Sequence, residues 1–434
     1  MTNPRLAAYN TLLQCEKDGL YSNIAVDHTI RNSAFDKRDS ALYTNLVYGV
    51  ISRKKTLDYI IASLCEKNPK RLDKSVLVLL RLGIYQIKYC SKIPVNSSVD
   101  ETVKLASRYA SRAKGFINAI LRKAISFELD LSSVKDNAER LSVKYSVSTD
   151  IARLLIKDYG SDAESILSSL EKEPPVTVAV NPLKTSISEM EKRFPTAIKG
   201  KYSPLSLVFS EKEAVAHLEE MKNGYITVQD QASQIAVCAL EAEKGMTVVD
   251  TCSCPGGKSF FAAFCMQNEG EIYSFDLHEN KLSLISSGAQ RLGISIIKTA
   301  TRDATVPDPS LFEKADRVIC DVPCSGIGVI AKKPDLRYKE KNVFDELPDI
   351  QYKILCESSK YLKPGGILIY STCTLYKKEN EENVKRFLNA HPEFSLYDFK
   401  SDNISSENGM LTLRPDIHET DGFFIARFRK KDLL

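Results

Sequence analysis

Residues Val248–Ala263 have the sequence VVDTCSCPGGKSFFAA, which is typical of a strand, a tight loop and a helix in direct succession. The apolar start suits a buried parallel strand, and Asp250 ends it. Gly256 and Gly257 allow the backbone to turn sharply and to expose N–H groups at the start of the helix. The segment therefore predicts the ligand-binding corner of a doubly wound sheet. A glycine-rich turn in some other α/β fold is the alternative.

The loop also indicates the kind of ligand. It matches neither GxGxxG nor GxxxxGK(S/T), the motifs that hold pyrophosphates and triphosphates. Lys258 adds a positive charge beside the opening. A ligand that combines a carboxylate with an adenosine, such as S-adenosylmethionine, suits these features better.

Strands and helices alternate from Met246 onward. The expected strands are Val248–Asp250, Ile272–Phe275, Lys298–Ala300, Arg317–Cys320, Gly366–Tyr370 and a late hairpin strand, Gly422–Arg429. The expected helices are Gly257–Met266, Asn280–Leu292, Glu346–Tyr361 and Lys378–Ala390. Repeated units of this kind predict a Rossmann-like α/β domain with a mostly parallel sheet, whose ligand lies at the carboxyl ends of the strands.

Two aspartates follow successive strands of this domain. Asp276 ends the second strand, 20 residues after Gly256, where an acid commonly accepts hydrogen bonds from ribose hydroxyls. Asp303 follows the third strand, where an acid and its backbone can hold adenine. The alternatives are a helix cap for Asp276 and an exposed turn for Asp303. Together with the loop, the two acids favour a nucleoside cofactor.

Two cysteines follow the next two strands. Cys324 lies in DVPCSG after the fourth strand, and Cys373 lies in STCTL after the fifth. Because both strand ends face one crevice, both thiols can reach one substrate. The alternative is that each is an inert buried side chain, as most cysteines are. A metal site is not expected, because the chain has only 5 histidines and neither CxxC nor HExxH spacing.

A pair of thiols beside a methyl donor suits methylation of cytosine at C5. That carbon is too weak a nucleophile to attack a methyl sulfonium, but a thiolate that adds at C6 turns the ring into an enamine. Asp321 can hydrogen-bond the N3/N4 edge of the base, and a second thiol fits the release step. The base must leave its stack to reach such a pocket.

The front of the chain has a different character. Residues 4–125 have helical spacing throughout, which predicts an all-α domain. Residues 1–125 contain 21 lysines and arginines against 10 aspartates and glutamates, although the net charge of the whole chain is only +4. This excess favours a module that binds a polyanion, and a merely solvated surface is the alternative.

The chain of 434 residues is expected to be multidomain. We predict a helical domain at residues 1–135, a small α+β connector at residues 136–228 and the Rossmann-like domain at residues 229–434. No secretory signal or membrane span is expected, because the apolar run at residues 76–80 ends at Arg81. Eleven cysteines without a disulfide pattern indicate a reduced, cytoplasmic protein.

Several motifs resemble known families. The segments NLVYGV (Asn45–Val50), LRLGIYQ (Leu80–Gln86) and GFINAILR (Gly115–Arg122) resemble the NusB-like RNA-binding module. DTCSCPGGK, DVPCSG and STCTL with the downstream Glu379-Asn380-Glu381 resemble the S-adenosylmethionine-dependent RNA 5-methylcytosine methyltransferases. Taken together, residues 4–430 are similar to the Sun/Fmu family of ribosomal RNA methyltransferases.

This resemblance implies methylation of C5 of a cytosine in 16S ribosomal RNA, free or in an early small-subunit particle, by a monomer that uses S-adenosylmethionine. It implies that Cys373 is the nucleophile, that Cys324 assists product release and that Asp321 acts at the base. The implied cofactor or base contacts are Cys252, Ser253, Cys254, Pro255, Gly256, Gly257, Lys258, Asp276, Asp303 and Asp321.

The same chemistry on transfer RNA is an alternative, and so is a non-catalytic RNA-binding or ribosome-assembly factor. Two retained thiols count against the second, because a pure binder needs neither. The chain also departs from the family pattern at a few positions. The departures are Ser253-Cys254 for two alanines, Val322 for alanine, Ala331-Lys332-Lys333 where two arginines are usual, and Ser148 for proline.

Overall fold

The computed structural model describes residues 3–65, 68–172, 174–209, 215 and 218–432. The chain forms two compact units. We call Met1–Glu171 with Ile330–Glu340 the helical unit, and Lys172–Val329 with Lys341–Leu434 the sheet unit. Among the described residues, no helix has both the length and the apolar character that crossing a bilayer requires.

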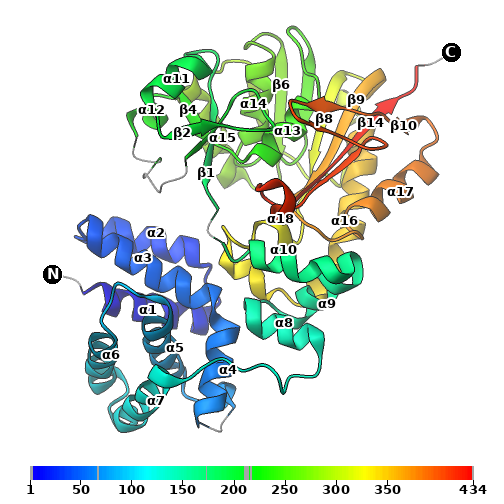
Figure 1. Cartoon of the computed structure of the whole chain (residues 1–434). Coiled ribbons are helices and arrows are strands. Elements are labelled where there is room, and N and C mark those ends of the chain that lie inside the picture. The colour runs from blue at the N-terminus through cyan, green and yellow to red at the C-terminus, as the bar shows by residue number, and fades with distance from the viewer. Residues whose placement is uncertain (1–2, 66–67, 173, 210–214, 216–217, 433–434) are drawn as a thin grey trace. The chain divides into compact units, whose positions relative to one another are not determined.

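The helical unit confirms the all-α fold expected for its first 125 residues. Its helix α5 packs against α1, α3, α4, α6 and α7, and it supplies much of the apolar core (Figure 1). The helices are α1 (Pro4–Asp18), α2 (Ser22–Asn32), α3 (Lys37–Ser52), α4 (Lys54–Cys65), α5 (Lys74–Tyr89), α6 (Val95–Tyr109), α7 (Lys114–Ser126), α8 (Asn137–Tyr145), α9 (Thr149–Tyr159) and α10 (Ala163–Ser169).

Two glycines explain how the helices of the NusB-like segments approach one another. A Cβ atom on Gly49 of α3 would lie 2.0 Å from the ring of Tyr85 in α5. A Cβ atom on Gly83 of α5 would lie 2.5 Å from the side chain of Leu121 in α7. The motifs NLVYGV, LRLGIYQ and GFINAILR therefore meet in one core, where only glycine leaves room for the facing side chain.

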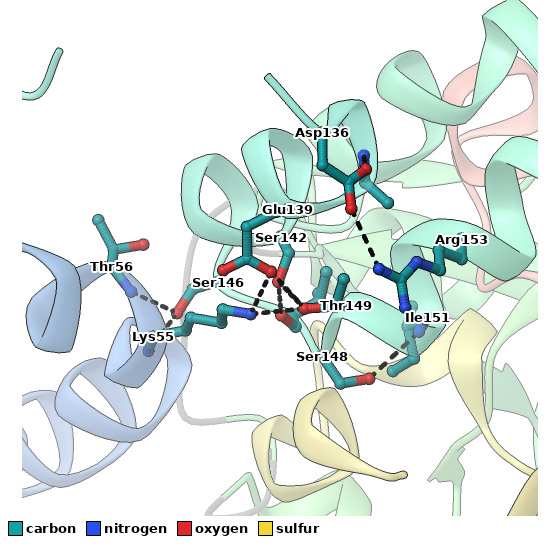
Figure 2. A network of polar contacts seen from close by, with 12 residues as sticks. Lys55, Thr56, Asp136, Glu139, Ser142, Ser146, Ser148, Thr149, Ile151 and Arg153 are labelled. Atoms are coloured by element: carbon teal, nitrogen blue, oxygen red, sulfur yellow. Dashed lines mark hydrogen bonds and ion pairs between the residues drawn. The ribbon is translucent and has the colours of Figure 1, made fainter. Parts of the chain in front are cut away.

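Helix α8 packs beside α4, and polar contacts join α4 to both α8 and α9 (Figure 2). Lys55 donates to Glu139 (3.2 Å) and to Thr149 (2.7 Å), and the Ser146 hydroxyl accepts the backbone N–H of Lys55 (3.0 Å). Ser148 accepts the N–H of Ile151 (3.2 Å) and so caps α9.

The segment Ile330–Glu340 reaches the helical unit from a distant part of the chain. The buried Arg337 guanidinium donates to the carbonyls of Tyr145 (3.1 Å) and Leu170 (2.6 Å). The Tyr338 hydroxyl donates to the carbonyl of Ile51 (2.7 Å), and Asp335 accepts from the hydroxyl of Ser22 (2.5 Å). These bonds make the segment part of the helical unit.

The division into three domains stays a prediction, and the two units divide the expected connector. Residues 136–171 lie in the helical unit and residues 172–228 in the sheet unit. The second part forms an antiparallel sheet in the order β2-β3-β1-β4. Its elements are β1 (Val176–Val180), α11 (Ile187–Arg193), β2 (Ala197–Lys199), β3 (Ser206–Phe209), α12 (Glu219–Lys222) and β4 (Ile226–Val228).

The main sheet confirms the Rossmann-like domain. Its order is β10-β14-β9-β8-β5-β6-β7, with β13 also paired to β14. Strands β5 to β9 are parallel, and β14 is antiparallel to β9 and β13 (Figure 1). The strands are β5 (Thr247–Asp250), β6 (Glu271–Asp276), β7 (Ile297–Thr301), β8 (Ala315–Asp321), β9 (Leu362–Thr372), β10 (Phe394–Leu396), β13 (Met410–Leu413) and β14 (Phe423–Lys430).

Successive residues of a strand point to opposite faces of the sheet. Both faces carry apolar side chains, and helices cover both. Val248 faces a core that includes residues of α13, α14 and α15, whereas Val249 faces a core that includes residues of α16 and α17. A separate short pair is formed by β11 (Lys400–Ser401) and β12 (Ile404–Ser405). The helices of the domain are α13 (Gln231–Cys238), α14 (Gly257–Cys265), α15 (Glu279–Leu292), α16 (Lys341–Ser359), α17 (Glu381–Ala390) and α18 (Pro415–His418).

Candidate active site

The loop between β5 and α14 forms a backbone cradle. The N–H and the hydroxyl of Ser253 both donate to the carbonyl of Phe275 (2.8 Å each), which ties the loop to β6. Gly256 has φ +108°, and a Cβ atom there would lie 2.5 Å from the Phe260 ring. No side chain caps α14, which begins at Gly257. The first N–H groups of the helix are therefore suited to an anionic group.

Asp276 lies at the end of β6 beside this cradle. One carboxylate oxygen accepts the N–H of Cys254 (3.3 Å), and the other accepts the N–H of His278 (3.0 Å). Each oxygen retains a lone pair for a further donor. The structure thus places Asp276 next to the loop, as the spacing predicts.

Asp303, after β7, is exposed. Its carboxylate accepts both the N–H (2.8 Å) and the hydroxyl (2.7 Å) of Thr305, and these bonds lower its pKa. The structure therefore shows the exposed turn that was the alternative for this residue. Its contact with a cofactor stays a prediction.

Lys258 and Asp321 form an ion pair of 2.7 Å between α14 and the end of β8. The Ser371 hydroxyl donates to the second oxygen of Asp321 (2.7 Å). Burial alone would lower the pKa of Lys258, but the charge and the hydrogen bond of Asp321, together with the charges of Asp250 and Cys373, outweigh burial and raise the pKa. Lys258 is thus a half-buried cation held at the carboxylate of Asp321, at the end of β8, rather than a charge beside the loop alone.

The two predicted thiols lie side by side. The sulfur atoms of Cys324 and Cys373 are 3.1 Å apart, and both side chains are half-buried, reduced thiols. The hydrogen bond to Cys373, burial and nearby carboxylates raise the pKa of Cys324 well above its ordinary value. Adjacent parallel strands β8 and β9 hold the two loops, so the structure brings together the two cysteines that the sequence places at neighbouring strand ends.

The other cysteines near the loop have a different environment. Burial raises the pKa of Cys252 well above its ordinary value and raises that of Cys320 to about 12. Burial also raises the pKa of Cys254. Pro255, between Cys254 and Gly256, is exposed at the rim of the loop. Residues 252–258 thus line the cradle mainly with their backbone. The raised pKa values of Cys252 and Cys254 keep these two side chains as protonated thiols.

Sequence reasoning missed several polar residues around the site. Asp250 is buried and accepts from the Ser259 hydroxyl (2.7 Å), and burial raises its pKa to about 7. Gln351 is buried in α16 and donates to the carbonyl of Pro323 (2.9 Å), directly before Cys324. An amide at an inward position of an amphipathic helix is the signal that could have identified Gln351. Among the described residues, no group of three or more His, Cys, Asp or Glu could hold a metal ion.

Comparisons with known proteins agree with this geometry. Residues 237–429 match the family model described as 16S rRNA methyltransferase RsmB/F, and residues 2–126 match that of the NusB family. The chain is 33% identical to the "Probable ribosomal RNA small subunit methyltransferase B" of Bacillus subtilis over 99% of both chains. It is 32% identical to the protein of the same name from Synechocystis, over 99% of this chain and all of the other.

Solved structures agree as well. The crystal structure of PH0851 has a TM-score of 0.83 and 26% identity and covers 99% of both chains. A methyltransferase homolog protein from Pyrococcus horikoshii has a TM-score of 0.60 and 27% identity, over 68% of this chain and all of the other. The architecture of both units therefore recurs in a solved protein.

Proposed function

Because the chain belongs to the ribosomal RNA small subunit methyltransferase B family of ribosomal RNA methyltransferases, we propose that it methylates C5 of a cytosine in 16S ribosomal RNA. The pair of thiols 3.1 Å apart beside Asp321 is the observation that carries this proposal. Methylation at an exocyclic nitrogen or a ribose hydroxyl needs no cysteine, whereas C5 needs a nucleophile at C6. We place the reaction in the cytoplasm and in a monomer, on free RNA or on an early small-subunit particle.

S-adenosylmethionine is the methyl donor of this proposal, and the residues present fit it. The N–H groups at the start of α14 suit its carboxylate. The half-buried carboxylate of Asp276 suits the two ribose hydroxyls. When bound, the cofactor supplies an electrophilic methyl group. Asp303 is proposed near the adenine, and Cys252–Lys258 form the wall of the site.

In the proposed reaction, the sulfur of Cys373 adds to C6 of the cytosine, and the electrons of the C5–C6 double bond become available at C5. Asp321 accepts a hydrogen bond from the N4 amino group of the base, which fixes the ring over the thiols. Lys258 holds Asp321 in place through the 2.7 Å ion pair. After methyl transfer, the C5 hydrogen leaves as a proton to a base, and its electron pair forms the double bond again. As this double bond forms, the sulfur of Cys373 leaves with the electrons of its bond to C6, and Cys324 assists this release.

The excess of basic residues in the helical unit supports RNA as the polyanion that binds there. The NusB family match of residues 2–126 supports the same assignment. We propose that this unit supplies affinity through phosphate contacts, while the sheet unit selects the unstacked cytosine.

Bisulfite sequencing tests the proposal. Ribosomal RNA from cells with and without the gene is compared, and purified protein is then added to the unmethylated RNA with S-adenosylmethionine. One cytosine of 16S RNA should resist conversion only where the protein is present. If a cytosine of a transfer RNA resists bisulfite conversion instead, the substrate is transfer RNA and the chemistry is the same. If no cytosine in any RNA changes its conversion, C5 methylation is refuted.

A further inference from the structure

A group of buried polar side chains lies beneath the two thiols. Gln351, Glu379 and Asn380 are 0% exposed and Asn383 is 2% exposed. Three of them come from α17 or the turn before it, and Gln351 comes from α16. Amides and a carboxylate at such depth cost free energy unless hydrogen bonds satisfy them. Their partners therefore show what the group holds in place.

Two members of the group hold the Cys324 loop on both sides of the thiol. Glu379 accepts the backbone N–H of Ser325, which follows Cys324, at 2.9 Å. The same carboxylate oxygen accepts the Gln351 amide at 2.6 Å. That amide also donates to the carbonyl of Pro323, which precedes Cys324, at 2.9 Å. Because the bonds lie on both sides of Cys324, a displacement of the loop breaks at least one of them.

Asn380 holds the Cys373 loop in the same way. Its side-chain oxygen accepts the hydroxyl of Thr372 at 2.6 Å, and its side-chain nitrogen donates to the carbonyl of Thr374 at 3.0 Å. Thr372 and Thr374 are the two neighbours of Cys373. One amide side chain therefore holds both neighbours of the second thiol, Thr372 through its hydroxyl and Thr374 through its backbone carbonyl.

The hydrogen bonds around Cys324 and those around Cys373 form one connected network. Glu379 and Asn380 are consecutive residues, so a single peptide joins them. The hydroxyls of Ser325 and Thr374 lie 2.6 Å apart and bridge the two loops directly. The Tyr370 hydroxyl donates to the carbonyl of Glu379 (2.6 Å), and Asn383 donates to Gln351 (3.3 Å). A displacement of either loop is thus transmitted to the other.

We propose that Gln351, Glu379 and Asn380 are positioning residues that fix the two thiols relative to each other, with Glu379 acting on Cys324 and Asn380 acting on Cys373. We call these three residues the thiol clamp. The proposal rests on the proposed function, in which Cys373 attacks and Cys324 assists release. The carboxylate of Glu379 is also among the charges that raise the pKa of Cys324, which favours the protonated thiol before the base arrives.

The clamp predicts a different failure on each side. Glu379→Ala frees the Cys324 loop, so release should slow at least tenfold and a covalent protein–RNA species should accumulate while Cys373 is intact. Asn380→Ala frees the Cys373 loop, so formation of that species should slow at least tenfold, with no accumulation. A residue that only stabilises the fold would slow both steps alike, because the same fraction of folded protein performs both.

The experiment uses the full-length protein, unmethylated 16S RNA and S-adenosylmethionine. Denaturing electrophoresis measures the covalent species and a methyl-transfer assay measures product. Glu382→Ala, at an exposed position of α17, is the matched control and should leave the ratio of the two unchanged. Calorimetric binding of S-adenosylmethionine should be unchanged in every variant, because the clamp residues hold the loops after β8 and β9. If Glu379→Ala does not fold, Gln351→Ala, which removes the bond to Pro323, takes its place with the same expected accumulation.

The outcomes separate the clamp from the function on which it rests. If Cys324→Ala accumulates the covalent species but the clamp variants keep the wild-type ratio, the clamp is refuted and the function stands. If all clamp variants lose both steps equally, the residues are structural only and the clamp is again refuted. If even Cys324→Ala forms no covalent species, the proposed covalent chemistry fails first.

Discussion

The sulfur of Cys324 lies 3.1 Å from that of Cys373, and this contact affects the acidity of Cys324. The pKa of Cys324 is raised by its hydrogen bond to Cys373, by burial and by carboxylates, which include Asp321. A thiol held in this way is a poor first nucleophile but, once deprotonated, a strong base. At the scale of single residues, this environment supports the assisting role that we propose for Cys324.

The division of labour predicts different failures for the two cysteines. Cys373→Ala cannot form the C6 adduct, so it should bind RNA but neither methylate nor form a covalent species. Cys324→Ala can still attack and transfer the methyl group, so it should accumulate a covalent protein–RNA species on a denaturing gel. The double variant should show none. If Cys373→Ala traps the adduct and Cys324→Ala does not, the roles are reversed.

Asp276 is expected to determine cofactor affinity. Asp276→Ala removes charge-assisted hydrogen bonds, so the affinity for S-adenosylmethionine in calorimetry should fall by about tenfold or more. Asp276→Asn keeps one acceptor oxygen and should fall between this variant and wild type. Glu279→Ala, an exposed acid at the start of α15, is the control and should have little effect. An equal loss in the control would assign the effect to general charge rather than to ribose binding.

Asp250 is expected to make stability depend on pH. Burial raises its pKa from 3.8 to about 7, so between these values the folded chain keeps a proton that the unfolded chain loses. Its contribution to stability is therefore fully present below about pH 4 and is lost as the pH rises through about 7. Asp250→Asn does not titrate. In urea unfolding, the stability of wild type minus that of Asp250→Asn should fall between about pH 4 and 7 and then level off. A constant difference would refute the assignment.

At the scale of elements, patterns of apolar residues were sufficient for the long helices and the main strands. The five parallel strands and α14 to α17 lie within a few residues of the predicted ranges, apart from the longer ends of β9 and α16. The pattern works because Val248 and Val249 bury against opposite helical layers, so each strand needs a continuous apolar run. The two thiol loops were likewise predictable, because they follow directly from the strand ends.

Other elements could not be predicted, for identifiable reasons. Strands β2 and β4 have three residues each, which is too short for a visible alternation. Helix α12 (Glu219–Lys222) has only four residues, and residues 214, 216 and 217 shortly before it lie outside the described residues. The role of Gln351 depends on which loop its helix faces, and a single sequence carries no such tertiary information.

Close packing between helices predicts a strong effect at Gly49. Gly49→Ala places a methyl group about where the Tyr85 ring now lies, and such overpacking costs roughly 1–3 kcal/mol. The melting temperature should fall. Tyr85→Leu makes room, so the double variant Gly49→Ala/Tyr85→Leu should be destabilised by less than the sum of the two single variants. Gly115→Ala is the control, because no atom lies within 4 Å of a Cβ atom there. If the destabilisation of the double variant equals the sum of the two single variants, the contact between Gly49 and Tyr85 is not the cause of the effect.

At the scale of the whole molecule, the charge of the helical unit should govern RNA affinity. Arg108, Arg112 and Lys114 are exposed around the turn between α6 and α7. Replacing all three with serine should weaken RNA binding and reduce the slope of log affinity against log salt by roughly 0.7–0.9 for each phosphate that the protein no longer neutralises. Lys144→Ser removes a lysine already paired with Glu164 and is the control. An unchanged slope in the triple variant would make this face a solvated surface only.

The segment Ile330–Glu340 has a consequence for how the protein is made. The helical unit holds the first 171 residues, but Arg337 and Tyr338 bind carbonyls within it. During translation, these two side chains emerge only after β5 to β8 have been synthesised. The helical unit can therefore acquire its last buried hydrogen bonds only when most of the sheet unit has left the ribosome. A nascent chain stopped before residue 330 should show a helical unit that proteases cleave faster than the same unit in the released protein.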